Sequence, residues 1–162
     1  MSLLVRKIAR SKWYNKKQNI DIDTPADAIS SCLRTQNNTL SVWRIEDESE
    51  VKEAILAIIS NQDQLDTIDI VILKETYLSE NSIQIETTKG ETPVKELVNI
   101  HRDLSQLTYS KLGIIAKHIT DQEATFKRIT VKDSKQIILE AIEKKRLSID
   151  DLKVKVRMKI AA

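Results

Sequence analysis

Short apolar or alternating stretches along the chain predict β-strands. They cover residues 3–8, 39–45, 68–73, 82–88 and 126–131. Residues 68–73 are apolar at every position except Asp69, as in a central strand that is buried on both faces. Residues 153–160 read Lys-Val-Lys-Val-Arg-Met-Lys-Ile, and this strict alternation predicts a last strand with its basic residues on one face.

Apolar residues spaced by three and four positions predict helices between these strands. Thr24 and Pro25 resemble the cap and first residue of a helix over residues 25–33, and residues 34–38 form a turn around Asn37 and Asn38. A second helix covers residues 49–60, and Asp133 caps another that extends to about residue 142. Residues 93–119 predict one long helix, or two helices that are broken near Gly113.

The order of these elements predicts an α+β or mixed α/β fold. Strands and helices alternate, and no repeat or linker separates them. We expect a single domain over residues 1–162, with a mixed sheet of about five to six strands and about four helices. Hydrophobic residues make up 41% and charged residues 31% of the chain, which is typical of a globular protein.

Scarce residue types exclude several kinds of active site. Gly90 and Gly113 are the only glycines, so no P-loop or dinucleotide-binding loop is present. Cys32 is the only cysteine, and His101 and His118 are the only histidines, which excludes an internal disulfide and the usual structural zinc sites. We therefore expect no cofactor, no metal and no catalytic residues.

A magnesium-dependent nuclease is the one enzymatic alternative. Asp151 and Lys153, with Asp133 or Glu140 upstream, are the candidates for its acidic residues and lysine. Neither a signal peptide nor a membrane-spanning segment is recognisable, because the longest apolar run is residues 54–59. We expect a cytoplasmic protein that does not bind membranes.

Charge is separated along the chain although the net charge is only +2. Residues 1–19 carry six basic and no acidic side chains, residues 127–162 carry eleven and five, and residues 20–126 carry nine and nineteen. The two basic ends predict a surface for an acidic partner or for nucleic acid. Its expected residues are Arg6, Lys7, Arg10, Lys12, Lys16, Lys17, Lys153, Lys155, Arg157 and Lys159. Trp13 and Tyr14 are expected to anchor the partner.

Three segments carry a resemblance to a group of known proteins. They are Ala26-Asp27-Ala28-Ile29, Leu33-Arg34-Thr35 and Asn38-Thr39-Leu40-Ser41-Val42-Trp43. Here the chain resembles small accessory proteins of bacterial multi-gene defence systems, including those of Lamassu type, which contain an SMC-like ATPase and a nuclease. The resemblance covers about the first third of the chain and includes no catalytic motif. It implies a non-catalytic small subunit that holds an effector or an ATPase.

These observations together predict a binding protein. We expect a non-catalytic, protein-binding accessory subunit of a bacterial complex, with a role in defence, whose partner is an ATPase, a nuclease or a toxin. One alternative is an immunity protein or antitoxin that neutralises a toxin. Another is a nucleic-acid-binding module that contacts DNA through the basic termini, with an affinity that falls steeply with salt.

Overall fold

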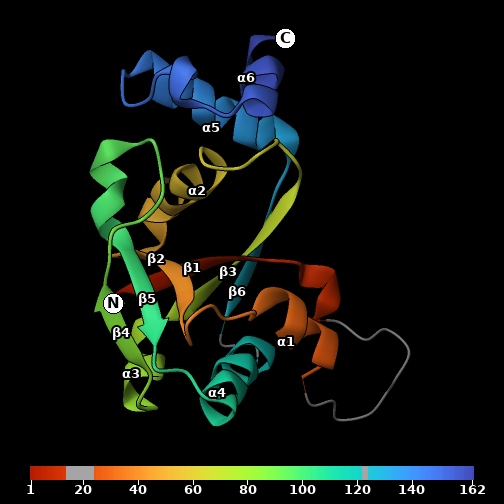
Figure 1. Cartoon of the computed structure of the whole chain (residues 1–162), viewed down its shortest axis with the longest axis vertical. Coiled ribbons are helices and arrows are strands. Elements are labelled where there is room, and N and C mark those ends of the chain that lie inside the picture. The colour runs from red at the N-terminus through yellow and green to blue at the C-terminus, as the bar shows by residue number, and fades with distance from the viewer. Residues whose placement is uncertain (14–23, 122–123) are drawn as a thin grey trace.

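A six-stranded antiparallel sheet forms the centre of the computed structural model, which describes residues 1–13, 24–121 and 124–162. The strands are β1 (Leu3–Ile8), β2 (Leu40–Ile45), β3 (Ile68–Lys74), β4 (Gln84–Thr87), β5 (His101–Ser105) and β6 (Thr125–Ile129). Their order across the sheet is β4-β5-β2-β1-β3-β6 (Figure 1). The α+β fold class is confirmed, and each strand pairing in the described residues is antiparallel, so the sheet is not mixed.

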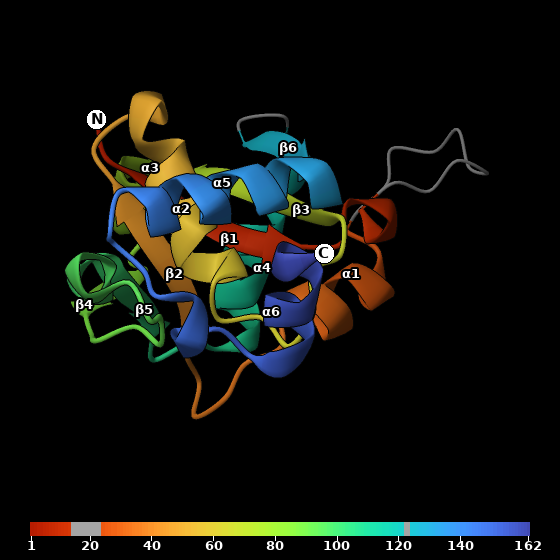
Figure 2. The ribbon, with the colours of Figure 1, turned by 90° about the horizontal axis from the view of Figure 1, so that it is seen from above.

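Helices cover both faces of the sheet. On one face lie α2 (Val51–Ile59), α5 (Val131–Glu143) and α6 (Val154–Ala161), which Figure 2 shows from above. On the other face lie α1 (Ala26–Cys32), α3 (Glu75–Glu80) and α4 (Tyr109–Thr120). Short 3-10 helices η1 (Arg10–Lys12), η2 (Glu48–Glu50), η3 (Lys95–Ile100) and η4 (Ile149–Asp151) complete the chain, which has more helices than the four expected.

Alternating strand residues divide the core into two layers. In β3, Ile70 and Ile72 pack under α2 and α5, whereas Val71 and Leu73 pack against α1 and α4. All four side chains are at most 3% exposed. The apolar run of residues 68–73 is therefore an interior strand that is buried on both faces, as its sequence predicts.

The helix expected over residues 93–119 is wrong in its first half. Residues 95–100 form η3, and the next five residues form β5 between β2 and β4. Leu104 is fully buried in that strand. The spacing of its apolar residues is compatible with a helix, but the backbone of this segment pairs with a strand on each side, and this pairing determines its conformation. Only α4 remains helical, and Gly113 lies inside it without breaking it.

The strand expected at residues 153–160 is also wrong. This segment is α6, and its buried residues are Val156 and Ile160, which lie one helical turn apart and pack in the core beside α5. Strict alternation places i and i+4 residues on one side of a helix as well as of a strand. Lysine, arginine and methionine are good helix formers, so the segment can adopt either conformation. Burial of Val156 and Ile160 beside α5 favours the helix.

Two predicted caps shift by a few residues. Pro25 occupies the N-cap position of α1, so Thr24 is not the cap. In α5 the N-cap is Thr130, and Asp133 is the third helical residue, whose carboxylate accepts the Thr130 backbone N–H in a capping box. Asn37 and Asn38 adopt positive φ angles of 53° and 58°, which confirms the predicted turn.

Candidate functional site

The basic residues near the N-terminus belong to different elements and make different contacts. Arg6 and Lys7 lie on β1, and Arg10 and Lys12 belong to η1. The guanidinium of Arg10 lies over the ring of Phe126 at 5.5 Å, and its backbone N–H donates to Asp69. Lys12 is exposed. Tyr14, Lys16 and Lys17 fall outside the described residues.

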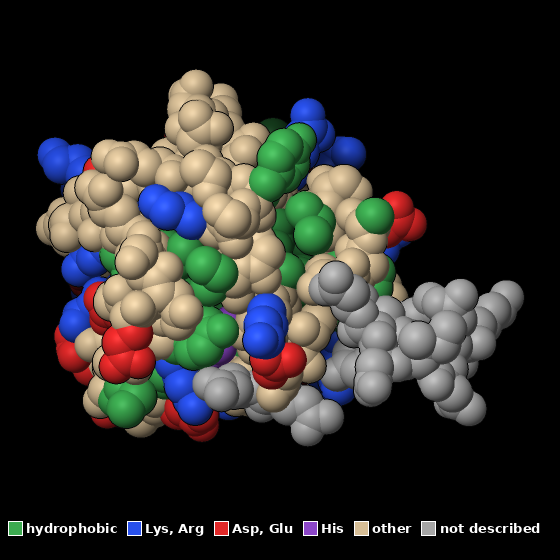
Figure 3. Space-filling model, turned by 90° about the horizontal axis from the view of Figure 1, so that it is seen from below, with side chains coloured by type: hydrophobic (Ala, Val, Ile, Leu, Met, Phe, Trp, Pro, Cys, Tyr) green, Lys and Arg blue, Asp and Glu red, His purple; other side chains and the backbone are tan. Residues whose placement is uncertain are grey.

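Trp13 is not an exposed partner anchor. Its side chain is only 7% exposed and packs in the core layer that contains α1 and α4. Its position within a polar, basic stretch of sequence concealed this role. Figure 3 shows the molecule from below, where hydrophobic side chains lie on the surface among charged side chains.

The C-terminal basic residues do not form a ribbon. On a helix with 100° between residues, Lys155 and Lys159 lie on one side of α6 and Arg157 lies on the other, which corrects the single basic face expected from a strand. Lys153 pairs with Asp63 at 2.9 Å, and Arg157 lies 3.8 Å from Asp150. The Lys159 ammonium donates to the carbonyl of Leu65.

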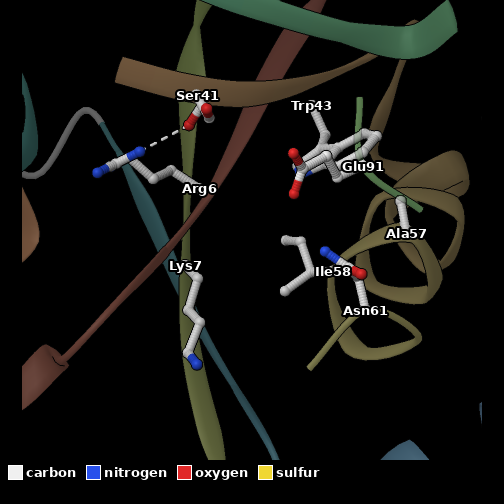
Figure 4. A pocket seen from close by; sticks show the side chains of 8 residues that line it. All are labelled: Arg6, Lys7, Ser41, Trp43, Ala57, Ile58, Asn61 and Glu91. Atoms are coloured by element: carbon white, nitrogen blue, oxygen red, sulfur yellow. Dashed lines mark hydrogen bonds between the residues drawn. The ribbon is translucent and has the colours of Figure 1, made fainter. Parts of the chain in front are cut away.

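A hollow opens in the sheet where β1 leaves β2. The two strands pair at Leu3, Leu4 and Val5, but no register partner on β2 follows Val5, although β1 pairs with β3 as far as Ile8. Beyond this point the Arg6 side chain bridges the gap. Its Nη1 donates to the Ser41 carbonyl at 2.7 Å, as Figure 4 shows. Its Nε donates to the Cys32 carbonyl at 3.0 Å.

Three hollows have lining residues in common, and we refer to them together as the groove. The first, of about 310 Å³, is lined by Arg6, Lys7, Ser41, Trp43, Ala57, Ile58, Asn61 and Glu91. The second, of about 400 Å³, shares Ser41, Trp43, Asn61 and Glu91 and adds Gln36, Asn37, Thr39, Lys89, His101 and Asp103. The third, of about 520 Å³, shares Lys7 and Asn61 and adds Gln62, Asp63, Gln64, Asp66, Lys153 and Lys155.

The third hollow brings parts of both basic ends together. Lys7 from β1 lies there with Lys153 and Lys155 from the start of α6. Asp63 and Asp66 line the same hollow, and the Lys153 ammonium lowers the pKa of Asp63. Cations and carboxylates therefore line the same hollow, and their charges partly offset one another.

Aromatic packing builds the other wall of the groove. His101 meets Trp43 edge to face, with ring centroids 4.9 Å apart, and its Nδ1 lies 2.7 Å from the hydroxyl of Thr88. Burial lowers the pKa of His101, so its ring is neutral at pH 7. Because the helix expected at this position is a strand, the sequence interpretation missed this wall. Residues 101–105 read His-Arg-Asp-Leu-Ser, in which Leu104 is the single apolar residue, so no alternation in the sequence indicated a strand.

The outer face of α6 presents Val154 and Met158 to solvent. Their exposed fractions are 60% and 67%, and they lie one helical turn apart, opposite the buried pair Val156 and Ile160. Lys155 and Lys159 flank this outer face on one side and Arg157 flanks it on the other. Exposed apolar residues that are rimmed by polar groups are typical of interaction surfaces.

The described residues contain no cluster that fits a metal ion and no helix that fits a membrane span. Within residues 1–13, 24–121 and 124–162, no three His, Cys, Asp or Glu side chains gather as a metal site would require. In the same residues no helix has the length and apolar character needed to cross a membrane. Comparisons with protein-family models, curated proteins and solved structures gave no match.

Proposed function

We propose that this protein is a non-catalytic, protein-binding accessory subunit of a bacterial complex, of the defence type that its sequence resembles. The observation that carries the proposal is the outer face of α6, where Val154 and Met158 are exposed on a helix whose opposite side is in the core. Keeping two large apolar side chains in water is unfavourable, and a protein partner that covers them gains that free energy.

Charge around this face specifies the partner's chemistry. Lys155 and Lys159 on one side and Arg157 on the other form a positive rim. A second copy of this chain would bring like charges together, which disfavours self-association through α6. We therefore expect a partner surface with an apolar centre and acidic residues around it, on an ATPase, a nuclease or a toxin.

The two alternatives differ from this proposal in what they bind. An immunity protein or antitoxin would bind a toxin alone, without the rest of a complex. A nucleic-acid-binding module would use Lys7, Lys153 and Lys155, which line one hollow. Asp63 and Asp66 in that hollow weaken its attraction for phosphate, so this alternative has less support.

The test is co-purification from the native host with a matched pair of variants. We would purify the tagged protein at about 0.5 M salt, which screens exposed charges but leaves a buried interface intact, and identify bound chains by mass spectrometry. Met158→Asp introduces a charge into the outer face of α6. Tyr109→Asp makes the same kind of change at a 94% exposed residue on α4, on the opposite side of the sheet.

The proposal expects a stoichiometric partner with the wild type and with Tyr109→Asp, and its loss with Met158→Asp. Circular dichroism and thermal unfolding establish that both variants are folded. Retention of the same partner by Met158→Asp would contradict the docking surface. If no chain co-purifies and the protein binds DNA at low salt, the nucleic-acid alternative replaces the proposal.

A further inference from the structure

Arg6 is a partly buried cation that no carboxylate of the described residues pairs with. Several other arginines form ion pairs with Asp or Glu, namely Arg44, Arg128, Arg146 and Arg157. Arg6 instead donates to the backbone carbonyls of Cys32 and Ser41, and no acidic side chain in the described residues forms an ion pair with it. These carbonyl dipoles accept two of the five guanidinium N–H groups and do not neutralise a full positive charge.

The surroundings make this charge unfavourable. Burial lowers the pKa of Arg6 to about 10, whereas the carboxylates beside Arg44 and Arg146 raise the pKa of those groups. Arg6 is still protonated at neutral pH, so the fold maintains a cation where water is partly excluded. An anion placed beside it would be attracted more strongly than on an open surface, because screening is weaker there.

The structure also provides space for such an anion. Arg6 lines the hollow of about 310 Å³ that opens where β1 leaves β2. Lys7, the next residue, is exposed and also lines this hollow. Figure 4 shows its side chain extending in a different direction from that of Arg6, as expected for consecutive strand residues. Ala57 and Ile58 of α2 form an apolar wall, and Figure 4 shows the Asn61 amide beside them.

We propose that Arg6 and Lys7 bind an oxyanion, either a carboxylate or a phosphate, in the hollow where β1 separates from β2. A volume of about 310 Å³ is at the lower end of the range for small-molecule sites, so the ligand is a small molecule or a single acidic group. Glu91 lines the same hollow and opposes the anion. This site is separate from the outer face of α6, so it does not depend on the function proposed above.

The two charged neighbours give predictions of opposite sign. Removing a positive charge with Lys7→Gln weakens binding about fivefold, and removing the opposing negative charge with Glu91→Gln tightens it by a similar factor. Lys132→Gln in α5 is the matched control, because it removes one exposed lysine that does not line the groove. It leaves the affinity unchanged. Within the described residues the side chains of Lys7 and Glu91 make no hydrogen bond or ion pair, so the test changes these two residues and leaves Arg6 in place.

The experiment is a titration of the full chain with sodium phosphate and, separately, with sodium acetate, at constant ionic strength. Two-dimensional NMR follows the Nε–H of Arg6 and the indole N–H of Trp43, which lines the same hollow. Saturable shifts with either probe, together with the opposite effects of Lys7→Gln and Glu91→Gln, support the site, and the tighter probe distinguishes a carboxylate from a phosphoryl ligand. Shifts that do not saturate, or that change equally in Lys7→Gln and Lys132→Gln, would overturn it.

Discussion

Replacing Gly90 by alanine will destabilise the wall of the groove. A Cβ at this position would lie 2.3 Å from Cη2 of Trp43, 2.6 Å from its Cζ3 and 2.8 Å from Cβ of His101. Gly90 does not have a positive φ angle, so an alanine introduces no backbone strain. The effect of the substitution therefore reports packing against Trp43 and His101.

The magnitude follows from how far these groups have to move. Ordinary contacts with a Cβ begin at 3.4 Å, so the indole of Trp43 must shift by roughly 1 Å, which costs about 1–3 kcal/mol in a packed site. Trp43 is 8% exposed and His101 packs on its edge, which limits relaxation. Alanine also restricts the unfolded chain, which offsets about 0.4–1 kcal/mol. The expected net loss is about 1–2 kcal/mol.

Urea unfolding followed by far-UV circular dichroism measures this loss as a change in midpoint at constant slope. The other glycine is the control. Gly113 lies in the interior of α4, and a Cβ there would meet nothing within 4 Å. Gly113→Ala should therefore stabilise the protein by about 1 kcal/mol through helix propensity.

A double-mutant cycle tests the stated cause. In a Trp43→Leu background the two closest atoms are gone, so Gly90→Ala should lose the part of its effect that comes from the indole, while the contact with Cβ of His101 remains. If Gly90→Ala is as stable as the wild type, or destabilises the Trp43→Leu protein by the same amount, the close approach of Gly90 to the indole is refuted.

Three further predictions concern single contacts. Lys145 follows α5 with a φ angle of 58°, so Lys145→Gly should stabilise the fold by about 1 kcal/mol in urea unfolding, and no gain would contradict a left-handed helix end. Arg146 donates to both carboxylate oxygens of Glu53, so Arg146→Gln should lower the free energy of unfolding by about 2 kcal/mol; an unchanged urea midpoint would argue against this contact. Arg128 lowers the pKa of Asp69 through a side-chain hydrogen bond, so the ionised Asp69 stabilises the fold above its ordinary pKa and this contribution is lost as the pH falls below about 4. Asp69→Asn should be less stable at pH 7 and should show a smaller loss on acidification to pH 3 than the wild type, and parallel pH profiles would refute the assignment.

Most of the fold was predictable because local pattern and tertiary environment agree. Residues 68–73 are apolar at every position except Asp69, and such a run has few alternatives to an interior strand. The helix over residues 51–59 and the asparagine turn after α1 were predictable for similar reasons. In these segments periodicity, propensity and burial favour the same structure.

The candidate site was less predictable because it depends on contacts between distant segments. Arg6 and Lys7 were identified from charge alone, but the gap between β1 and β2 that gives them a common hollow involves strands more than thirty residues apart. His101 was missed because its segment was interpreted as helical. Trp13 was placed on the surface because its neighbours in sequence are polar, whereas its neighbours in space are apolar.

The amino-acid sequence by itself determined the α+β class, most of the strands and the separation of charge between the ends and the middle of the chain. Tertiary structure alone decided that residues 101–105 form a strand and residues 154–161 a helix. In both segments the local pattern allows either conformation, and the free energy gained by pairing with β2 and β4, or by burying Val156 and Ile160 beside α5, selects between them. It also placed Lys7 of β1 in one hollow with Lys153 and Lys155, because α6 packs on the sheet side that holds α2.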